Sequence, residues 1–445
     1  MLKIYETVEE AQEILQRREM LTVADVPEVV LAGIERVFGE PLTPEAAVAR
    51  LLAEVRARGD AALRDWTAHI DGLTVDALEV PPSEWKDAYD ALDPELREAL
   101  EFAAGRVRDF HARQPIPDWT TTEMGGVVGQ RFTPIRRAGV YVPGGAAPLP
   151  SSLLMTAIPA QVAGVDEIII CTPPGRPDGA VDPTILAAAH IVGVDRLFRV
   201  GGALAVAALA FGSESIPRVD KIVGAGGLFT TIAKRQVYGI VGLDGLAGPT
   251  ETMVIADAAA NPAWVAADLL AQAEHDVLAT AILLTPSRAL AEAVQAEVER
   301  QIASLSRSEV LATSLAGQGG IVLTPDLATA ARVADAFAAE HLCLAARDPQ
   351  ALMGQIRNAG GFFLGEHSCE VLGDYVAGPS HVMPTGGTAR FAAPVNVLDF
   401  VKLSSIIALD DATAQRIAPV AARIARAESL TAHAAAADYR IKSAD

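Results

Sequence analysis

The stretch "DEIIICTPPGRPDGAVDPTILAAAHIVGVDRLFRVGG", residues 166–202, decides the fold of this chain. The β-branched run at 166–174 predicts a buried strand, and the Ala-rich run at 183–193 predicts a helix. Residues 195–202 predict a second strand that ends in a glycine pair. A strand, a helix and a strand in this order predict two parallel strands joined by a helical crossover.

The same alternation continues along the chain. A helix at 203–212 and a strand at 220–227 complete the first series. After residues 242–251 a second series begins, with predicted strands at 252–257, 281–287, 320–325, 341–346 and 361–366 and predicted helices at 262–275, 288–303, 326–339 and 349–358. Two such series predict an α/β fold with two doubly wound, parallel-sheet domains and a crevice between them.

Composition excludes several classes of protein. The 445 residues exceed what one core usually organises, and a hydrophobic content of 51% excludes wholesale disorder. No apolar run approaches the roughly 18 residues of a membrane span, and the polar, acidic start is unlike a secretory signal. A net charge of −20 argues against a nucleic-acid or anionic-membrane surface.

The three cysteines, at 171, 343 and 369, are odd in number and have no CxxC spacing. This pattern predicts a reduced, cytoplasmic protein without a disulfide framework. Cys343 lies two residues after His341, but its setting in "HLCLAA" favours a buried strand position over a thiol nucleophile.

Three glycine-rich loops follow predicted strands, at 142–148, 200–205 and 223–229. The last begins as G-x-G, but Phe229 occupies the position of the third glycine, so a complete dinucleotide fingerprint is absent. Such glycines serve either as turn formers or as the lining of a nucleotide crevice, and the spacing does not separate the two.

Polar residues in otherwise apolar settings are the candidate site. Gln272 and His275, in "DLLAQAEHDVLA", would share one face of a helix. With Asp374 and His433 they would form a zinc-type ligand set, with Asp268 as a rival ligand. Satisfied polar residues at the edge of a core are the alternative. Glu340 and His341 could serve two proton transfers at one site, or His341 could interact with the last carbonyls of a helix.

Several longer motifs resemble the histidinol dehydrogenase family. They are "GVYVPGG…APL", "VDKIVG", "AGPTE", "DLLAQAEH", "AAEHL", "FLGE…GDYVAGPSHVMPTGGTAR" and "AESLTAH", in the family's order from about residue 45 to the C-terminus. The first 40 residues resemble the family only loosely.

The resemblance implies a cytoplasmic homodimer that oxidises L-histidinol to L-histidinal and then to L-histidine, the last steps of histidine biosynthesis, using NAD and one zinc per site. It implies two incomplete Rossmann-like domains with helical arms exchanged in a domain-swapped dimer. The expected divisions are an N-terminal arm (1–42), a zinc and substrate domain (43–138 and 249–396), an NAD-binding domain (139–248) and a C-terminal helical arm (397–445).

The resemblance also assigns residues. Glu340 and His341 match the catalytic pair, and the zinc ligands are Gln272, His275, Asp374 and His433, with His433 coming from the partner subunit. The same four ligands, with His341, Thr250 (usually Ser in the family) and Glu428, contact substrate, and His381 lies in the same pocket.

The cofactor contacts depart from the family pattern. Tyr141 is retained, whereas Leu204 replaces a usual Gln and Gly227 a usual Asn. Weaker NAD binding is therefore expected. A relative acting on another small amino or hydroxy alcohol, and a zinc hydrolase in which Glu340 activates water, are the alternative readings.

Overall fold

A computed structural model describes residues 2–16, 26–144 and 148–441. The chain divides into two compact units, residues 1–113 with 136–400, and residues 114–135 with 401–445. The larger unit contains two parallel sheets, here called sheet A and sheet B, and the smaller unit contains one antiparallel sheet. In the described residues no helix is both long and apolar enough to cross a bilayer.

Sheet B contains the two parallel strands and the crossover helix predicted from residues 166–202. Its strands run in the order β6-β5-β4-β7-β8 and all pair in parallel. Their bounds are β4 Arg137–Tyr141, β5 Glu167–Thr172, β6 Arg196–Arg199, β7 Lys221–Val223 and β8 Gly242–Leu243. The chain moves outward from β4 to β6 and then returns to the other side of β4 with β7. The carboxyl ends of β4 and β7 therefore form the topological switch point of this sheet.

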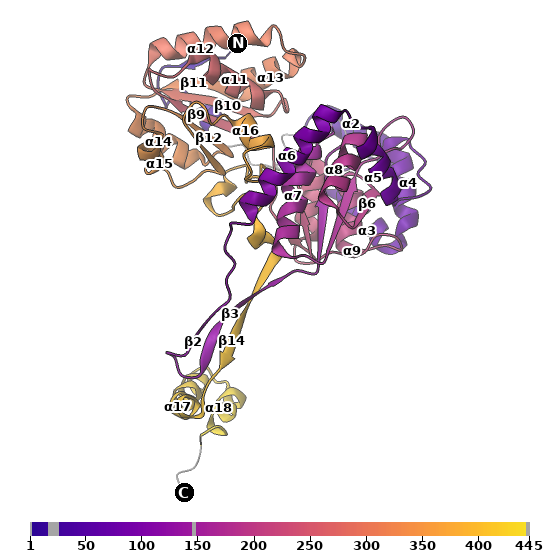
Figure 1. Ribbon diagram of the computed structural model, residues 1–445, viewed down its shortest axis with the longest axis vertical. Helices are drawn as coiled ribbons and strands as arrows, with labels where there is room; N and C mark the ends of the chain where they lie inside the picture. Colours follow the sequence, from indigo (N-terminus) through magenta and orange to yellow (C-terminus); the bar gives the residue numbers. More distant parts are fainter. Residues whose placement is uncertain (1, 17–25, 145–147, 442–445) are drawn as a thin grey trace. The chain divides into compact units, whose positions relative to one another are not determined.

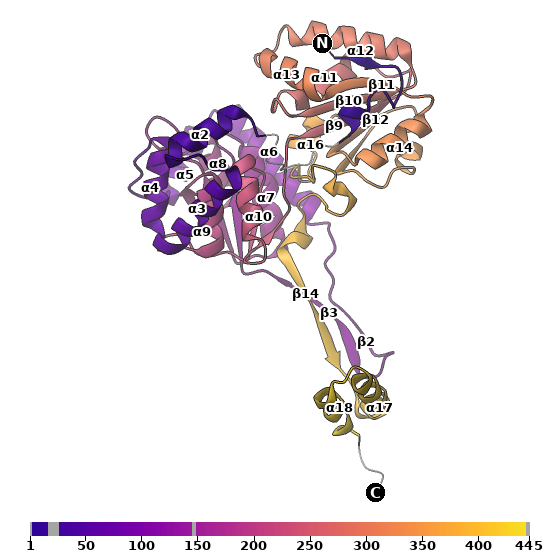
Figure 2. The same ribbon diagram turned by 180° about the vertical axis from the view of Figure 1, so that it is seen from behind.

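Helices cover both faces of sheet B (Figure 2). The crossover helices are α7 (Pro150–Ala163), α8 (Pro183–Val192), α9 (Gly202–Phe211) and α10 (Leu228–Val237). Nearly every residue of α9 is buried, as expected for a helix that is apolar all round.

The helices at 44–111 pack on sheet B, which corrects the expected grouping of residues 43–138 with the zinc domain. They are α3 (Pro44–Arg58), α4 (Asp60–Asp71), α5 (Pro82–Ala91) and α6 (Pro94–His111). The cap expected at Thr43 is present, since its side chain accepts a hydrogen bond from the Ala46 N–H. Val48 and Leu51 share one core with Ile169 and Val206 of sheet B and its crossover helix. Amphipathic spacing identifies the buried face of a helix but not the sheet it covers.

Sheet A has the strand order β1-β11-β10-β9-β12-β13, again all parallel (Figure 1). Its strands are β1 Ile4–Tyr5, β9 Glu251–Ala256, β10 Thr280–Thr285, β11 Gly319–Leu323, β12 His341–Ala345 and β13 Gly361–Leu364. Its helices are α11 Pro262–Ala273, α12 Arg288–Ile302, α13 Ser308–Gln318, α14 Leu327–Phe337, α15 Pro349–Met353 and α16 Glu370–Tyr375.

The first residues of the chain form part of sheet A, because β1 pairs with β11 and Leu2 is fully buried. Helices α1 (Gln12–Leu15) and α2 (Glu28–Phe38) follow. The expected N-terminal arm, residues 1–42, is therefore anchored at its start to sheet A. Residues 17–25 of this arm lie outside the described residues.

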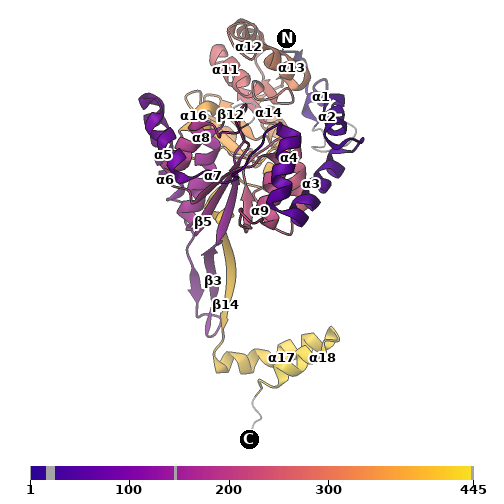
Figure 3. The ribbon, with the colours of Figure 1, turned by 90° about the vertical axis from the view of Figure 1, so that its right-hand side faces the viewer.

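The smaller unit contains a three-stranded antiparallel sheet that the sequence analysis missed. Strand β3 (Val127–Pro134) pairs with both β2 (Trp119–Thr121) and β14 (Val401–Ala408). The expected C-terminal helical arm, 397–445, is thus corrected, since it begins with the short helix η3 (Val397–Phe400) and an eight-residue strand. Its helices α17 (Asp411–Ala427) and α18 (Thr431–Asp438) form a hairpin (Figure 3).

Candidate active site

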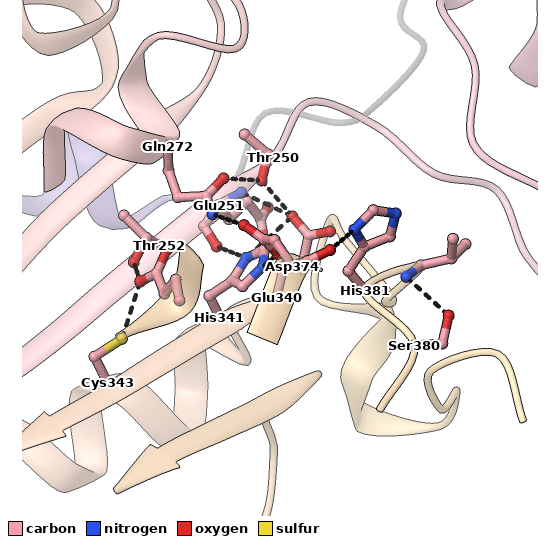
Figure 4. A network of polar contacts seen from close by, with 12 residues as sticks. Thr250, Glu251, Thr252, Gln272, Glu340, His341, Cys343, Asp374, Ser380 and His381 are labelled. Carbon is pink, nitrogen blue, oxygen red and sulfur yellow. Dashed lines mark hydrogen bonds and ion pairs between the residues drawn. The ribbon is translucent and has the colours of Figure 1, made fainter. Parts of the chain in front are cut away.

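A polar network lies at the amino ends of β9 and β12, which are neighbours in sheet A. Thr250 and Glu340 each directly precede one of these strands. The Thr250 hydroxyl lies 2.7 Å from Glu340 Oε2 and 3.0 Å from Gln272 Oε1. The Glu251 N–H donates to the same Glu340 oxygen at 3.1 Å. The parallel register therefore brings together residues 90 positions apart (Figure 4).

Glu340 is a buried carboxyl group with hydrogen-bond donors on one oxygen. Burial raises its pKa above the ordinary value, and the nearby His341, the Thr250 hydroxyl and the Glu251 N–H only partly offset this. A carboxyl group with a raised pKa exchanges protons closer to neutral pH, which suits general acid–base chemistry.

His341 is almost fully buried and is held at both ring nitrogens. Its Nε2 lies 3.3 Å from Asp374 Oδ1, and its Nδ1 lies 3.3 Å from the Glu251 backbone oxygen. The ring stacks on Phe363. Burial alone would lower the pKa of His341, but the charge of Glu340 and the hydrogen bond to Asp374 outweigh it and raise that pKa.

Three of the four predicted zinc ligands approach one another at the end of α11. Gln272, which is buried, donates from Nε2 to Asp374 Oδ2 at 3.3 Å. The helix ends at Ala273, so the predicted helix at 262–275 is two residues too long, and His275 lies in the bend beyond it.

The protonation states of His275 and Asp374 favour the binding of a cation. Desolvation lowers the pKa of His275, which favours a neutral imidazole. Burial would raise the pKa of Asp374, but the hydrogen bond and charge of His341 outweigh it, so that pKa is lowered and the carboxylate is ionised. Neutral imidazole and ionised carboxylate are the forms that bind metals.

His381 joins this network from the loop after α16. Its Nδ1 lies 2.7 Å from the Asp374 backbone oxygen, and its Nε2 lies 3.3 Å from the Ser152 hydroxyl on α7. Desolvation lowers the pKa of His381. The site thus includes a contact between the lobe of sheet A and the lobe of sheet B, since α7 belongs to the latter.

Two predicted site residues are not brought into this network. Glu428 and His433 lie in the smaller unit, at the end of α17 and on α18, and both are exposed. Within the described residues no three His, Cys, Asp or Glu side chains are gathered closely enough to hold a metal ion.

Asp268 and Cys343 belong to a different cluster, next to Glu370. Burial, with the charges of Glu370 and Glu366, raises the pKa of Asp268 to about 7. The Cys343 thiol donates to Glu370 at 3.0 Å, and burial raises its pKa well above the ordinary value, which suits a structural residue better than a nucleophile.

Sequence reasoning missed Glu370 and the backbone role of Glu251. Glu370 is fully buried at the first turn of α16, where it also accepts from Thr252, and it lies four residues before Asp374. That spacing on one helix face was the available signal. No spacing rule identifies Glu251, because it acts through its peptide group.

The three predicted cofactor residues differ in their surroundings. Tyr141 is buried and its hydroxyl accepts a hydrogen bond from the Gly202 N–H at 3.1 Å. Leu204 is 3% exposed and belongs to the core between α9 and α3. Gly227 caps α10 in an extended conformation, and a side chain there would meet no atom within 4 Å. Residues 145–147 of the first glycine-rich loop lie outside the described residues.

Comparison with known proteins decides the family. The histidinol dehydrogenase family model matches residues 40–441. This chain belongs to the histidinol dehydrogenase family. A histidinol dehydrogenase of Deinococcus radiodurans is 54% identical over 420 residues, covering 94% of this chain and 95% of that protein. The Thermus thermophilus enzyme is 51% identical over 398 residues, covering 89% and 95%.

The fold agrees with the family as well. The crystal structure of histidinol dehydrogenase from Elizabethkingia anophelis superposes with a TM-score of 0.90 at 32% identity, covering 99% of this chain and 98% of that one. The predicted family and the two-lobed α/β fold are confirmed. As a histidinol dehydrogenase family member the chain is an oxidoreductase of amino-acid biosynthesis, and the hydrolase alternative loses its support.

Proposed function

We propose that this protein oxidises L-histidinol to L-histidine in two NAD-dependent steps at the amino ends of β9 and β12. The observation that carries the proposal is the joined network of Thr250, Glu340, His341, Gln272 and Asp374. In the first step the alcohol loses a hydride to NAD and a proton to a base. In the second step the hydrated aldehyde loses another hydride to NAD and a hydroxyl proton, which gives the carboxylic acid, and this acid releases one more proton to become the carboxylate.

Two proton-transfer groups with different surroundings suit two different steps. His341 is assigned to the hydroxyl proton of the alcohol. Its protonated form is favoured by Asp374, so any cation that engages the Asp374 carboxylate lowers the pKa of His341 toward the range of a useful base. Glu340, whose pKa is raised by burial, is assigned to activation of the water that adds to the aldehyde.

One zinc ion fits the donor set at the end of α11. Gln272, His275 and Asp374 offer an amide oxygen, a neutral imidazole and an ionised carboxylate, which are zinc-compatible ligands. The incomplete set leaves room for His433 from a second copy of the chain. When bound, zinc would fix the amino and imidazole nitrogens of the substrate, a positioning role. Thr250 and Glu428 are proposed as further substrate contacts.

The carboxyl edge of sheet B is proposed as the NAD site. It lies at the switch point of a parallel sheet, where such folds bind nucleotides. The loop after β4 begins next to Tyr141, and the loop after β7 contains Gly227. Leu204 offers no polar contact from its core position, so recognition there depends on backbone groups.

A homodimer with exchanged arms is supported by the smaller unit. Its helical hairpin has a core of only small side chains, including Ala422, Ala425 and Ala434. Ile417, Val420 and Ile424 of α17 are exposed at four- and three-residue spacing. A second copy is the proposed cover for this apolar face. A cytoplasmic location is proposed from the three free cysteines.

The direct test is NADH formation with L-histidinol, with and without a metal chelator, alongside other amino and hydroxy alcohols. Two NADH per histidine, lost on chelation and restored by zinc, is the expected result. If the protein oxidises another alcohol in preference to histidinol, that alcohol replaces histidinol as the proposed substrate. Turnover of a substrate without NAD reduction would refute the dehydrogenase assignment.

A further inference from the structure

A buried ion pair holds the glycine-rich loop that follows β7. Lys234 on α10 and Asp244 after β8 are nearly inaccessible to solvent, and Lys234 Nζ lies 2.5 Å from Asp244 Oδ1. The ammonium group also donates to the Gly224 backbone oxygen at 2.9 Å. The second Asp244 oxygen accepts from the Gly224 N–H at 2.7 Å. The two charges thus hold both backbone polar groups of one glycine.

Gly224 lies at the point where the backbone of the loop after β7 passes close to strand β4. It is the first residue after β7, at the switch point beside β4, and its φ is +110°. A Cβ atom there would lie 2.2 Å from the Tyr141 backbone oxygen, so the loop passes directly against the last residue of β4. Only glycine fits this close approach.

The segment after Asp244 leads directly to the substrate site. The Thr231 hydroxyl on α10 donates to the Ala247 backbone oxygen at 2.8 Å. The Gly248 N–H donates to Thr385 at 2.6 Å. Two residues later comes Thr250, which contacts Glu340 and Gln272. Residues 244–250 are therefore fixed at one end to the cofactor loop and at the other end to the polar network.

We propose that the Lys234–Asp244 pair is a positioning device that sets the cofactor loop at a fixed place relative to the segment carrying Thr250. The inference rests on the proposed NAD site. Burying two charges is a poor way to add stability, since well-packed apolar residues often do as well. An ion pair, however, supplies a donor and an acceptor together, and Gly224 needs both.

The test compares NAD binding, by calorimetry without substrate, with the kinetics of histidinol oxidation. Asp244→Asn keeps the shape, but an NH2 donor replaces one of the two oxygens that separately accept from Lys234 and from the Gly224 N–H. If Asp244→Asn fails to fold, the double variant Lys234→Met with Asp244→Leu is used instead. It removes both charges and therefore leaves no unpaired ion buried. Both variants should bind NAD about 10- to 100-fold more weakly, as displacement of a binding group does. Zinc content should remain as in wild type, because none of the proposed zinc ligands lies in the loop or segment that the pair holds.

Glu79→Gln is the control. Arg196 donates to both Glu79 oxygens, at 2.8 and 2.6 Å, so the same chemical change weakens a more exposed ion pair of the same lobe that does not touch the loop after β7. Its NAD affinity should match wild type. A folded double variant with wild-type NAD affinity would overturn the inference, as would an equal loss in Glu79→Gln. Wild type that binds NAD but does not oxidise histidinol would overturn only the proposed function.

Discussion

Leu204 and Gly227, the two departures from the family at the cofactor site, should respond differently to restoration of the usual residue. Leu204 is buried in the core of the sheet B lobe. Leu204→Gln removes part of a buried apolar side chain, worth about 1.5–3 kcal/mol when complete, and buries an amide without a partner, at about 1–3 kcal/mol. We expect a loss of about 2–5 kcal/mol in the free energy of unfolding of this lobe.

Gly227→Asn should be accommodated without cost. The backbone at Gly227 has φ −70° and ψ −176°, which any residue adopts, and no atom lies within 4 Å of the added Cβ. The position is the N-cap of α10, where Asn is preferred over Gly by a few tenths of a kcal/mol. One recovered hydrogen bond to NAD, about 0.5–1.5 kcal/mol, corresponds to about 2- to 13-fold tighter binding.

The free energy of unfolding is measured by urea denaturation, monitored with a probe located in the sheet B lobe. The affinity for NAD is measured by calorimetric titration. Leu209→Gln is the control for Leu204→Gln, because Leu209 is fully buried on the same helix and packs toward Gly139. It should destabilise to a similar extent. If Leu204→Gln is as stable as wild type and binds NAD more tightly, the Leu204 side chain faces the cofactor and the reasoning is wrong.

Two further predictions concern the substrate site, and a third concerns Asp268 in the cluster next to Glu370. His341→Asn should slow alcohol oxidation and Glu340→Gln mainly aldehyde oxidation, each by about 10²-fold or more, measured with histidinol and histidinal separately; equal damage to both steps would refute the division. Mixing inactive His433→Ala and His341→Ala subunits should restore some activity if sites are shared, and no recovery after verified subunit exchange would count against sharing. Asp268→Asn should keep zinc and activity but raise the melting temperature at pH 8. The folded pKa of about 7 exceeds the unfolded value, so ionisation destabilises wild type as pH rises from about 4 through 7; a difference that persists at pH 4 would contradict this cause.

The βα order was predictable because buried parallel strands are continuous apolar runs. Residues Ile168–Cys171 of β5 are buried on both faces and interrupted by no polar residue. Strand β14 gave no such signal. Most of its residues are exposed, and its partner β3 lies some 270 positions earlier in the chain, so neither periodicity nor a nearby turn marked it.

The residue types of the candidate site were predictable from the sequence, but their arrangement in space was not. The adjacency of Thr250 and Glu340 depends on the parallel register of β9 and β12, which no local pattern encodes. The ligand set followed from the family resemblance rather than from spacing. The helix predicted to carry both Gln272 and His275 ends at Ala273, and a turn in which the His275 N–H donates to the Gln272 backbone oxygen follows it.

In the proposed function the two lobes use opposite edges of their sheets, and this arrangement matches the proposed chemistry. Sheet B offers the carboxyl edge with its glycine loops, whereas sheet A offers the amino ends of β9 and β12. At that amino edge α11 ends, and the carboxyl terminus of a helix carries partial negative charge. A cation bound by Gln272, His275 and Asp374 is stabilised by that dipole, whereas the anionic phosphates of a dinucleotide are favoured at helix amino ends such as that of α10. Ser152 of the sheet B lobe contacts His381 beside Asp374, so the proposed substrate site includes a side chain from the lobe that is proposed to hold NAD.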